Sequence, residues 1–221
     1  LYRREQEIQD LRRAVLNLGM REVGDIASAI ATRSLFDPNL KAEFKAFAPR
    51  WNRMFLDTMT VAFGASAFTF EQQVGRAEHA FLSGMFHDIG KSIALRSLAA
   101  LVHQGLVELP LADAVVDEVL ERVHVEVGGD LHLVWGLPDY LTRVCLRHHE
   151  FETPIGPDFM DIHIIRLVEG FLSLLQEPQE TRYLHETRQS LQVLNLSHRN
   201  ALRLYVDMRA QAERVQLLFG A

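Results

Sequence analysis

The residues best suited to chemistry are histidines that stand next to acids at the ends of apolar stretches. His87 and Asp88 follow one such stretch. Phe81, Gly84 and Met85 share one helical face with that carboxylate, because the four positions are spaced i, i+3, i+4 and i+7. A carboxylate there is costly to bury unless it meets a cation, a metal or several hydrogen-bond donors. The pair is therefore a candidate site, and the alternative is a simple hydrogen bond across a helix end.

Further imidazoles and one carboxylate stand within the apolar stripes of other predicted helices. His124 begins a stripe that also contains Leu131 and Trp135. His148 ends the stripe of the next helix, and Glu169 falls inside the stripe of a later one. Because these stripes face a common core, we expect their polar members to converge. The predicted metal-binding cluster is His87, Asp88, His124, His148, His149 and Glu169.

Neutral histidine combined with hard oxygen ligands is typical of sites for Fe, Mn, Ni or Zn. The chain contains one cysteine, Cys145, so it has no thiolate motif for a closed structural zinc site. Consecutive residues on a helix point about 100° apart, so His148 and His149 cannot both follow its apolar face. Which of the two would bind a metal is left open.

The elements that must position these residues are nearly all helices. Apolar residues recur with the helical period and strand patterns are almost absent, which predicts an all-α fold in a single multi-helix bundle. We expect Gly90 to stop the helix of the His-Asp pair and Gly136 to end the helix of His124. Asp158 and Ser197 are the expected N-caps of two later helices. Separate helices are expected over residues 95–104, 111–122 and 124–135.

Composition restricts the classes of function. The 221 residues carry a formal net charge of −6, which argues against a nucleic-acid partner, since such proteins usually present a basic surface. No apolar run approaches the roughly 18 to 20 residues of a membrane-spanning helix, and no secretory pattern is visible. A single cysteine fits a reducing compartment. We therefore expect a cytoplasmic protein with no membrane partner.

The ordered set of motifs resembles a known family. His87-Asp-Ile-Gly-Lys91 is similar to the core motif of the HD superfamily of metal-dependent phosphohydrolases, and its context is closest to the HDOD branch, the HD-related output domains. The other matching segments follow in the family's order across roughly residues 10 to 215: Leu16–Met20, Trp51, His124–Gly128, Trp135–Pro138 and the pair His148-His149.

The resemblance implies a domain organisation. Residues 1–221 would form one HDOD-like domain, with an N-terminal helical part over 1–50, an HD-like core over 51–180 and C-terminal helices over 181–221. The family's domain normally begins with more N-terminal helix, so we expect a truncated N-terminal lobe.

Departures from the superfamily pattern bear on activity. The pattern opens with another histidine, and alignment from Trp51 places that position at about Arg53, whose guanidinium cannot bind a metal. We expect Arg53 to pair with Asp88 or Glu169 instead. The pattern's closing aspartate would fall near Glu169. The motif of the cyclic-dinucleotide phosphodiesterases is replaced here by Glu150–Pro157.

Two functions remain open from the sequence. The first is a bacterial signal-transduction output or interaction domain without catalysis, with other signalling proteins or domains, a nucleotide ligand or a second copy of the chain as partners. The alternative is a metal-dependent phosphohydrolase or phosphodiesterase acting on a nucleotide or cyclic dinucleotide. In that case Asp88 and Lys91 are the catalytic candidates, and Lys91 or Arg147 would contact phosphate.

Overall fold

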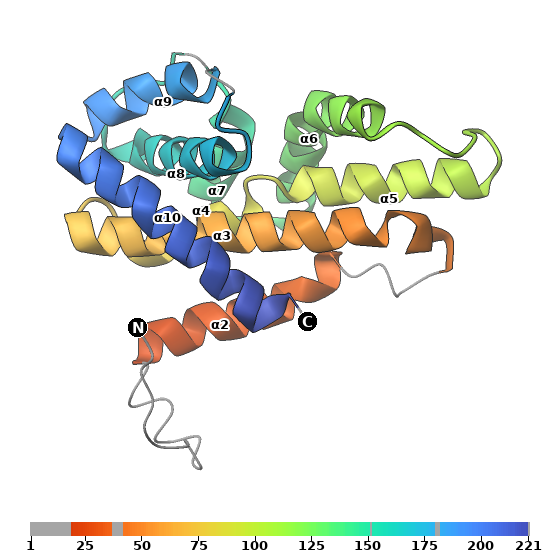
Figure 1. Ribbon diagram of the computed structural model, residues 1–221, viewed down its shortest axis with the longest axis horizontal. Coiled ribbons are helices and arrows are strands. Elements are labelled where there is room, and N and C mark those ends of the chain that lie inside the picture. Colours follow the sequence, from red (N-terminus) through yellow and green to blue (C-terminus); the bar gives the residue numbers. More distant parts are fainter. Residues whose placement is uncertain (1–18, 37–41, 151, 180–181, 221) are drawn as a thin grey trace, which may run out of the picture.

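The computed structural model describes residues 19–36, 42–150, 152–179 and 182–220 (Figure 1). Within these ranges every regular element is a helix, which confirms the predicted all-α bundle. Residues 1–18 of the expected N-terminal helical part, and the expected truncation of that lobe, lie outside the described residues. None of the described helices is both long and apolar enough to cross a membrane.

The longer helices are α2 (Met20–Thr32), α3 (Ala48–Gln72), α4 (Ala77–Phe86), α5 (Ile89–His103), α6 (Asp113–Trp135), α7 (Asp139–Arg147), α8 (Met160–Gln176), α9 (Arg182–Val193) and α10 (His198–Phe219). Short 3-10 turns are η1 (Arg33–Phe36), η3 (Ala42–Phe47) and η4 (Pro157–Phe159). Helix α3 runs through the middle of the molecule, with α5 and α6 stacked beside one half of it and α8 and α9 beside the other (Figure 1).

Helix α3 is central because it is buried on several sides along its length. Near its start, Trp51 is fully buried and meets Phe44 edge-on, with ring centroids 5.3 Å apart. Phe63 packs against Phe81 of α4 and stacks on Phe219 at the end of α10. A second apolar cluster joins the other half of α3 to α8 and α10. The polar cluster described below therefore rests on a well-packed frame.

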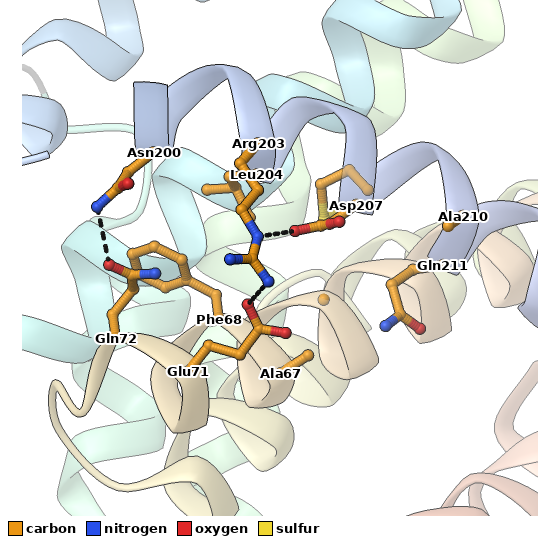
Figure 2. A pocket seen from close by; sticks show the side chains of 12 residues that line it. Ala67, Phe68, Glu71, Gln72, Asn200, Arg203, Leu204, Asp207, Ala210 and Gln211 are labelled. Atoms are coloured by element: carbon orange, nitrogen blue, oxygen red, sulfur yellow. Dashed lines mark hydrogen bonds and ion pairs between the residues drawn. The ribbon is translucent and has the colours of Figure 1, made fainter. Parts of the chain in front are cut away.

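Helix α10 crosses α3 through buried apolar contacts and through polar pairs at the rim (Figure 2). The buried Met208 side chain fills the space at Gly64, where an added Cβ would lie 2.5 Å from its sulfur. At the rim, Arg203 pairs with Glu71 at 3.3 Å. Exposed ion pairs contribute about 1 kcal/mol or less, so burial of Met208 is the stronger hold.

Gly90 does not stop a helix, which corrects the sequence prediction. Helix α4 ends at Phe86 and α5 begins at Ile89, so Gly90 lies inside the first turn of α5. Glycine is required there because α5 meets the backbone of α6: an added Cβ would lie 1.9 Å from the carbonyl oxygen of His124. Gly84 permits a similar approach of α4 to α3, with Ala62 Cα 2.6 Å from its ideal Cβ.

Several predicted helix boundaries also need correction. Helix α5 begins six residues before the expected start at 95, and the two helices expected over 111–122 and 124–135 are the single helix α6. Asp158 lies in η4 rather than capping α8. Gly136, with φ 61°, ends α6 as predicted, and Ser197 accepts a hydrogen bond from the Asn200 amide as the N-cap of α10.

The buried stripe of α6 differs from the predicted one. It runs through Val116, Leu120, His124, Gly128 and His132, which recur every fourth residue. Trp135 was expected on this stripe, but it is 43% exposed. The apolar pattern predicted an inward position for both His124 and Trp135, and of these two only His124 holds it.

The contact at Gly90 predicts a large effect of a single methyl group. Gly90→Ala should lower the free energy of unfolding by about 3 kcal/mol, because two backbones must separate to admit the Cβ. Gly24→Ala is the matched control: this helical glycine has no atom near its ideal Cβ, so the change should raise stability by about 0.5 to 1 kcal/mol. Urea unfolding measures both, and equal effects would contradict the close-approach argument.

Candidate metal centre

The structure brings all six predicted cluster residues together. His87 and Asp88 lie between α4 and α5, His124 lies on α6, the two consecutive histidines end α7, and Glu169 lies on α8. Potential ligand atoms lie within 4.8 Å of one another in two groups. One group is Asp88, His124, His148 and His149, and the other is His87, Asp88 and Glu169.

The Asp88 carboxylate lies at the centre of both groups. Its Oδ1 is 3.4 Å from the Nε2 atoms of His124 and of His148. Its Oδ2 is 2.7 Å from Lys91 Nζ and 3.6 Å from His87 Nε2. Asp88 also occupies the N-cap position of α5, where aspartate usually binds a backbone amide, yet its side chain makes no capping bond. The carboxylate is thus directed at the cluster instead.

Backbone carbonyls fix the orientation of the three inner imidazoles. The Nδ1 atoms of His87, His124 and His148 lie 2.8, 3.0 and 2.9 Å from carbonyl oxygens in the preceding turn of the chain. A carbonyl only accepts hydrogen bonds, so each Nδ1 carries the proton and donates it. In the neutral ring the Nε2 lone pair then faces Asp88, which is the tautomer used by metal-binding histidines whose other nitrogen is held by a carbonyl.

Three buried acceptor atoms consequently face one another. Asp88 Oδ1, His124 Nε2 and His148 Nε2 make no hydrogen bond with the residues that the structure describes. Burial is the largest influence on His124 and lowers its pKa to about 4, so this ring is neutral at physiological pH. Facing lone pairs repel unless a cation lies between them. The donor set fits a divalent transition metal.

The acidic residues of the cluster are ionised despite their burial. Burial alone would raise the pKa of Asp88, but the Lys91 ammonium, with His87, His148 and His124, holds that pKa well below its ordinary value. Burial would also raise the pKa of Glu169, but the nearby histidines, beginning with His149, lower it. Negative charge therefore remains available to a metal.

Lys91 is the cation inside the cluster. Its Nζ bridges Asp88 and Glu121 at 2.7 Å each. Arg53 was expected to pair with Asp88 or Glu169, but its side chain is exposed on α3. Among the described residues it makes no hydrogen bond or ion pair with either carboxylate. The expected pairing of Arg53 is therefore wrong, and the ammonium that follows the His-Asp motif replaces it.

Asp57 is a residue of this region that the sequence reasoning missed. Burial raises its pKa to about 6; the Gln176 hydrogen bond, Arg53 and Lys91 act in the opposite direction, and Asp88 adds to the rise. Gln176 Nε2 donates to Asp57 Oδ1 at 2.7 Å. The only sequence signal was its position four residues after Arg53, on the same side of the predicted helix.

The remaining candidates lie at or beyond the rim. His149 is exposed beside His148, with ring centroids 4.0 Å apart, so it marks the open side of the cluster. Arg147 is held by Glu150 at 2.6 Å. Cys145 is buried, and burial raises its pKa to about 12, which is typical of an unreactive thiol. His132 and His163, which showed no role in the sequence, are fully buried away from the cluster.

The helical bundle thus directs imidazoles and carboxylates from four segments at one point. The chain belongs to the HDOD domain family, whose model matches residues 1–151. No curated protein shows significant sequence similarity to it.

Two solved structures share the fold. An HDOD domain protein of unknown function from Geobacter sulfurreducens is 18% identical, with a TM-score of 0.68 over 97% of this chain and 76% of its own. A protein from Shewanella amazonensis described as a "putative metal-dependent phosphohydrolase" is 15% identical, with a TM-score of 0.64 over 96% of this chain and 75% of its own.

The raised pKa of Asp57 predicts a pH-dependent stability. A carboxyl that ionises near 6 when folded and near 3.8 when unfolded stabilises the fold at low pH, and this contribution is lost as pH rises through about 6. Asp57→Asn should therefore be more stable than wild type by about 2 kcal/mol at pH 7.5, with no difference below pH 4. Urea unfolding across this pH range, with a chelator present, measures the effect.

Asp130→Asn, at an exposed position of α6, is the matched control for this experiment. It should change stability by less than about 0.5 kcal/mol throughout. A constant difference between wild type and Asp57→Asn at all pH values would contradict the assigned ionisation.

Proposed function

We propose that this protein is a bacterial signal-transduction output or interaction domain whose buried cluster binds one divalent transition metal without catalysing hydrolysis. The observation that carries the proposal is the set of three facing acceptors: Asp88 Oδ1, His124 Nε2 and His148 Nε2. Fe, Mn, Ni and Zn all suit this mixture of imidazole and carboxylate. His149, on the open side, is the natural fourth ligand.

Lys91 occupies a position that disfavours hydrolysis. In a two-metal site the metals stabilise the attacking and leaving oxygens, and a carboxylate shared by both metals offers one oxygen to each. Here one oxygen of Asp88 already binds the Lys91 ammonium, which a second cation would have to displace. On α3, the position assigned to the missing histidine holds the exposed Arg53.

A bound metal would instead serve to fasten helices. Asp88, His124 and His148 belong to three different segments, so a metal held by them joins the α4–α5 connection to α6 and to the end of α7. Ligand binding that favours one packing of helices shifts the population toward it. Such repacking is the means by which the domain would pass a signal to another protein or domain, in keeping with HDOD membership.

One specific feature favours the alternative of a metal-dependent phosphohydrolase acting on a nucleotide or cyclic dinucleotide. The second group, His87, Asp88 and Glu169, shares Asp88 with the first, as a pair of adjacent metals would require. A metal in such a site would act as a Lewis acid on phosphate.

We place the protein in the bacterial cytoplasm, in agreement with its single cysteine.

Metal content tests the first part of the proposal. Protein purified without a histidine tag and reconstituted with Mn, Fe, Ni or Zn should hold about one metal per chain by elemental analysis. His124→Ala and His148→Ala should each lose the metal. His198→Ala, an exposed histidine at the start of α10, should retain it. Metal-free wild type under all four conditions would end the proposal.

Turnover tests the second part. With Mn or Fe added, wild type should hydrolyse nucleotide and cyclic-dinucleotide phosphodiesters no faster than His87→Ala, because Lys91 retains the Asp88 oxygen that a second metal needs. Chromatographic detection of released nucleotides is the measurement. Activity that wild type shows and His87→Ala lacks would establish the phosphohydrolase alternative.

A further inference from the structure

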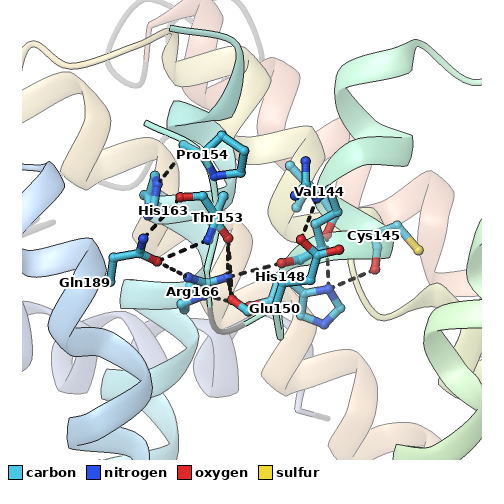
Figure 3. A network of polar contacts seen from close by, with 10 residues as sticks. Val144, Cys145, His148, Glu150, Thr153, Pro154, His163, Arg166 and Gln189 are labelled. Atoms are coloured by element: carbon cyan, nitrogen blue, oxygen red, sulfur yellow. Dashed lines mark hydrogen bonds and ion pairs between the residues drawn. The ribbon is translucent and has the colours of Figure 1, made fainter. Parts of the chain in front are cut away.

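A buried arginine of α8 holds the end of the helix that carries the paired histidines (Figure 3). Arg166 is 5% exposed. Its Nε donates to the His148 carbonyl at 2.9 Å, and its Nη2 donates to the Arg147 carbonyl at 3.1 Å. The same Nη2 also donates to the Glu150 carbonyl and, at 2.7 Å, to Thr153 Oγ1. One side chain thus binds the end of α7 and the turn that follows it.

The other side of the guanidinium binds α9. Arg166 Nη1 donates to Gln189 Oε1 at 3.1 Å. Gln189 also binds the turn directly, because its Nε2 donates to the Thr153 carbonyl at 3.1 Å. Figure 3 shows the arginine between the Gln189 side chain and the end of α7. Gln189 therefore helps to fix the direction from which Arg166 approaches His148.

The carbonyls at the end of a helix explain why a guanidinium binds there. The last carbonyls of an α-helix have no partner within it and are normally satisfied by water, by a glycine turn or by side chains. At the end of α7 the partner is a planar guanidinium, whose donors have a fixed relative geometry. Burying a charged group costs free energy unless its donors form hydrogen bonds. The Arg166 guanidinium forms them with the carbonyls at the end of α7, so its burial and the fixing of this helix end go together.

What lies at this end is a candidate metal ligand. The His148 ring is oriented by Nδ1 bonds to the Val144 and Cys145 carbonyls at 3.1 and 2.9 Å. These carbonyls belong to the last turn of α7, and Arg166 binds the two carbonyls that follow in the chain, those of Arg147 and His148. Arg166 binds the backbone carbonyl of the same histidine whose Nε2 faces Asp88.

We propose that Arg166 is a positioning residue of the cluster: it binds the carbonyls that end α7, sets the direction of His148 Nε2 and brings His149 to the open side. This inference rests on the proposed metal binding for its functional meaning. Arg166 and Gln189 both lie beyond the residues 1–151 that match the family, as Glu169 of α8 does, so α8 and α9 contribute to the centre from outside the matched region. Movement of α9 would change the metal site through Gln189 and Arg166.

The test compares Arg166→Met and Arg166→Lys with Arg33→Met. Arg33 is a matched control because its Nη1 donates to the Phe219 carbonyl at 2.9 Å, so it also binds the end of a helix, in this case α10. Gln189→Ala is a milder variant that keeps the experiment decisive if Arg166→Met does not fold. The readouts are Co²⁺ affinity by chelator competition, the visible Co²⁺ spectrum, and ¹H–¹⁵N spectra of the His148 ring in metal-free protein.

Loss of a group that orients a ligand typically weakens metal binding by about 10- to 100-fold. We expect this range for Arg166→Met, with an altered Co²⁺ spectrum, faster exchange of the His148 Nδ1 proton, and partial rescue in Arg166→Lys. Gln189→Ala should change the same signals in the same direction by a smaller amount. Arg33→Met should lower thermal stability and leave the Co²⁺ affinity, the Co²⁺ spectrum and the His148 signals unchanged.

The two proposals fail separately. If wild type binds neither Co²⁺ nor any of Mn, Fe, Ni and Zn, the proposed metal function fails, while the His148 signals of the metal-free variants still decide the role of Arg166. If Arg166→Met, or Gln189→Ala where that variant does not fold, keeps wild-type ring signals and wild-type affinity, the positioning role is overturned. Equal changes in Arg33→Met would overturn it as well, because general destabilisation would then explain them.

Discussion

Burial of the Asp88 carboxylate is the constraint on which this part of the structure depends. An ionised carboxylate inside a protein needs opposite charge or several donors close to it. Lys91 satisfies one oxygen at 2.7 Å, whereas the other oxygen faces two imidazole nitrogens with which it makes no hydrogen bond. The two oxygens of Asp88 thus differ in what neutralises them. Lys91 neutralises the first, and the metal that we propose would neutralise the second.

This arrangement requires four segments to meet at short range, and small residues make the approach possible. Gly90 admits the His124 carbonyl, and Gly128 of α6 lies against the same turn of α5. Gly84 brings the preceding helix against α3. An added Cβ at Gly90 or Gly84 would collide with the backbone of the neighbouring helix, and one at Gly128 would lie 2.7 Å from the Cys145 sulfur of α7. Close backbone packing and the convergence of the cluster therefore have a common cause.

Much of this could be predicted from the sequence, because histidines and carboxylates on the apolar faces of helices indicate where those helices meet. The helical class, the six cluster residues and the ends at Gly136 and Ser197 follow from such local patterns. Contacts between helices do not: the role of Gly90 depends on α6, which no pattern near residue 90 reveals. Arg53 failed as a predicted partner because alignment fixes a position along a helix without showing which face is buried.

Lys91 also bears on how the cluster behaves without a metal. If both oxygens of Asp88 needed a metal as counter-ion, removal of the metal would leave a buried, uncompensated negative charge. Such a charge typically costs about 3 to 5 kcal/mol. Because Lys91 is bound to one oxygen, Asp88 keeps an internal counter-ion whether or not a metal is present. Under the proposed function, metal binding would then change the alignment of α6 and α7 within a protein that is already folded. A reversible response of this kind suits a signalling domain better than a hydrolytic enzyme, whose second metal would have to remove the lysine.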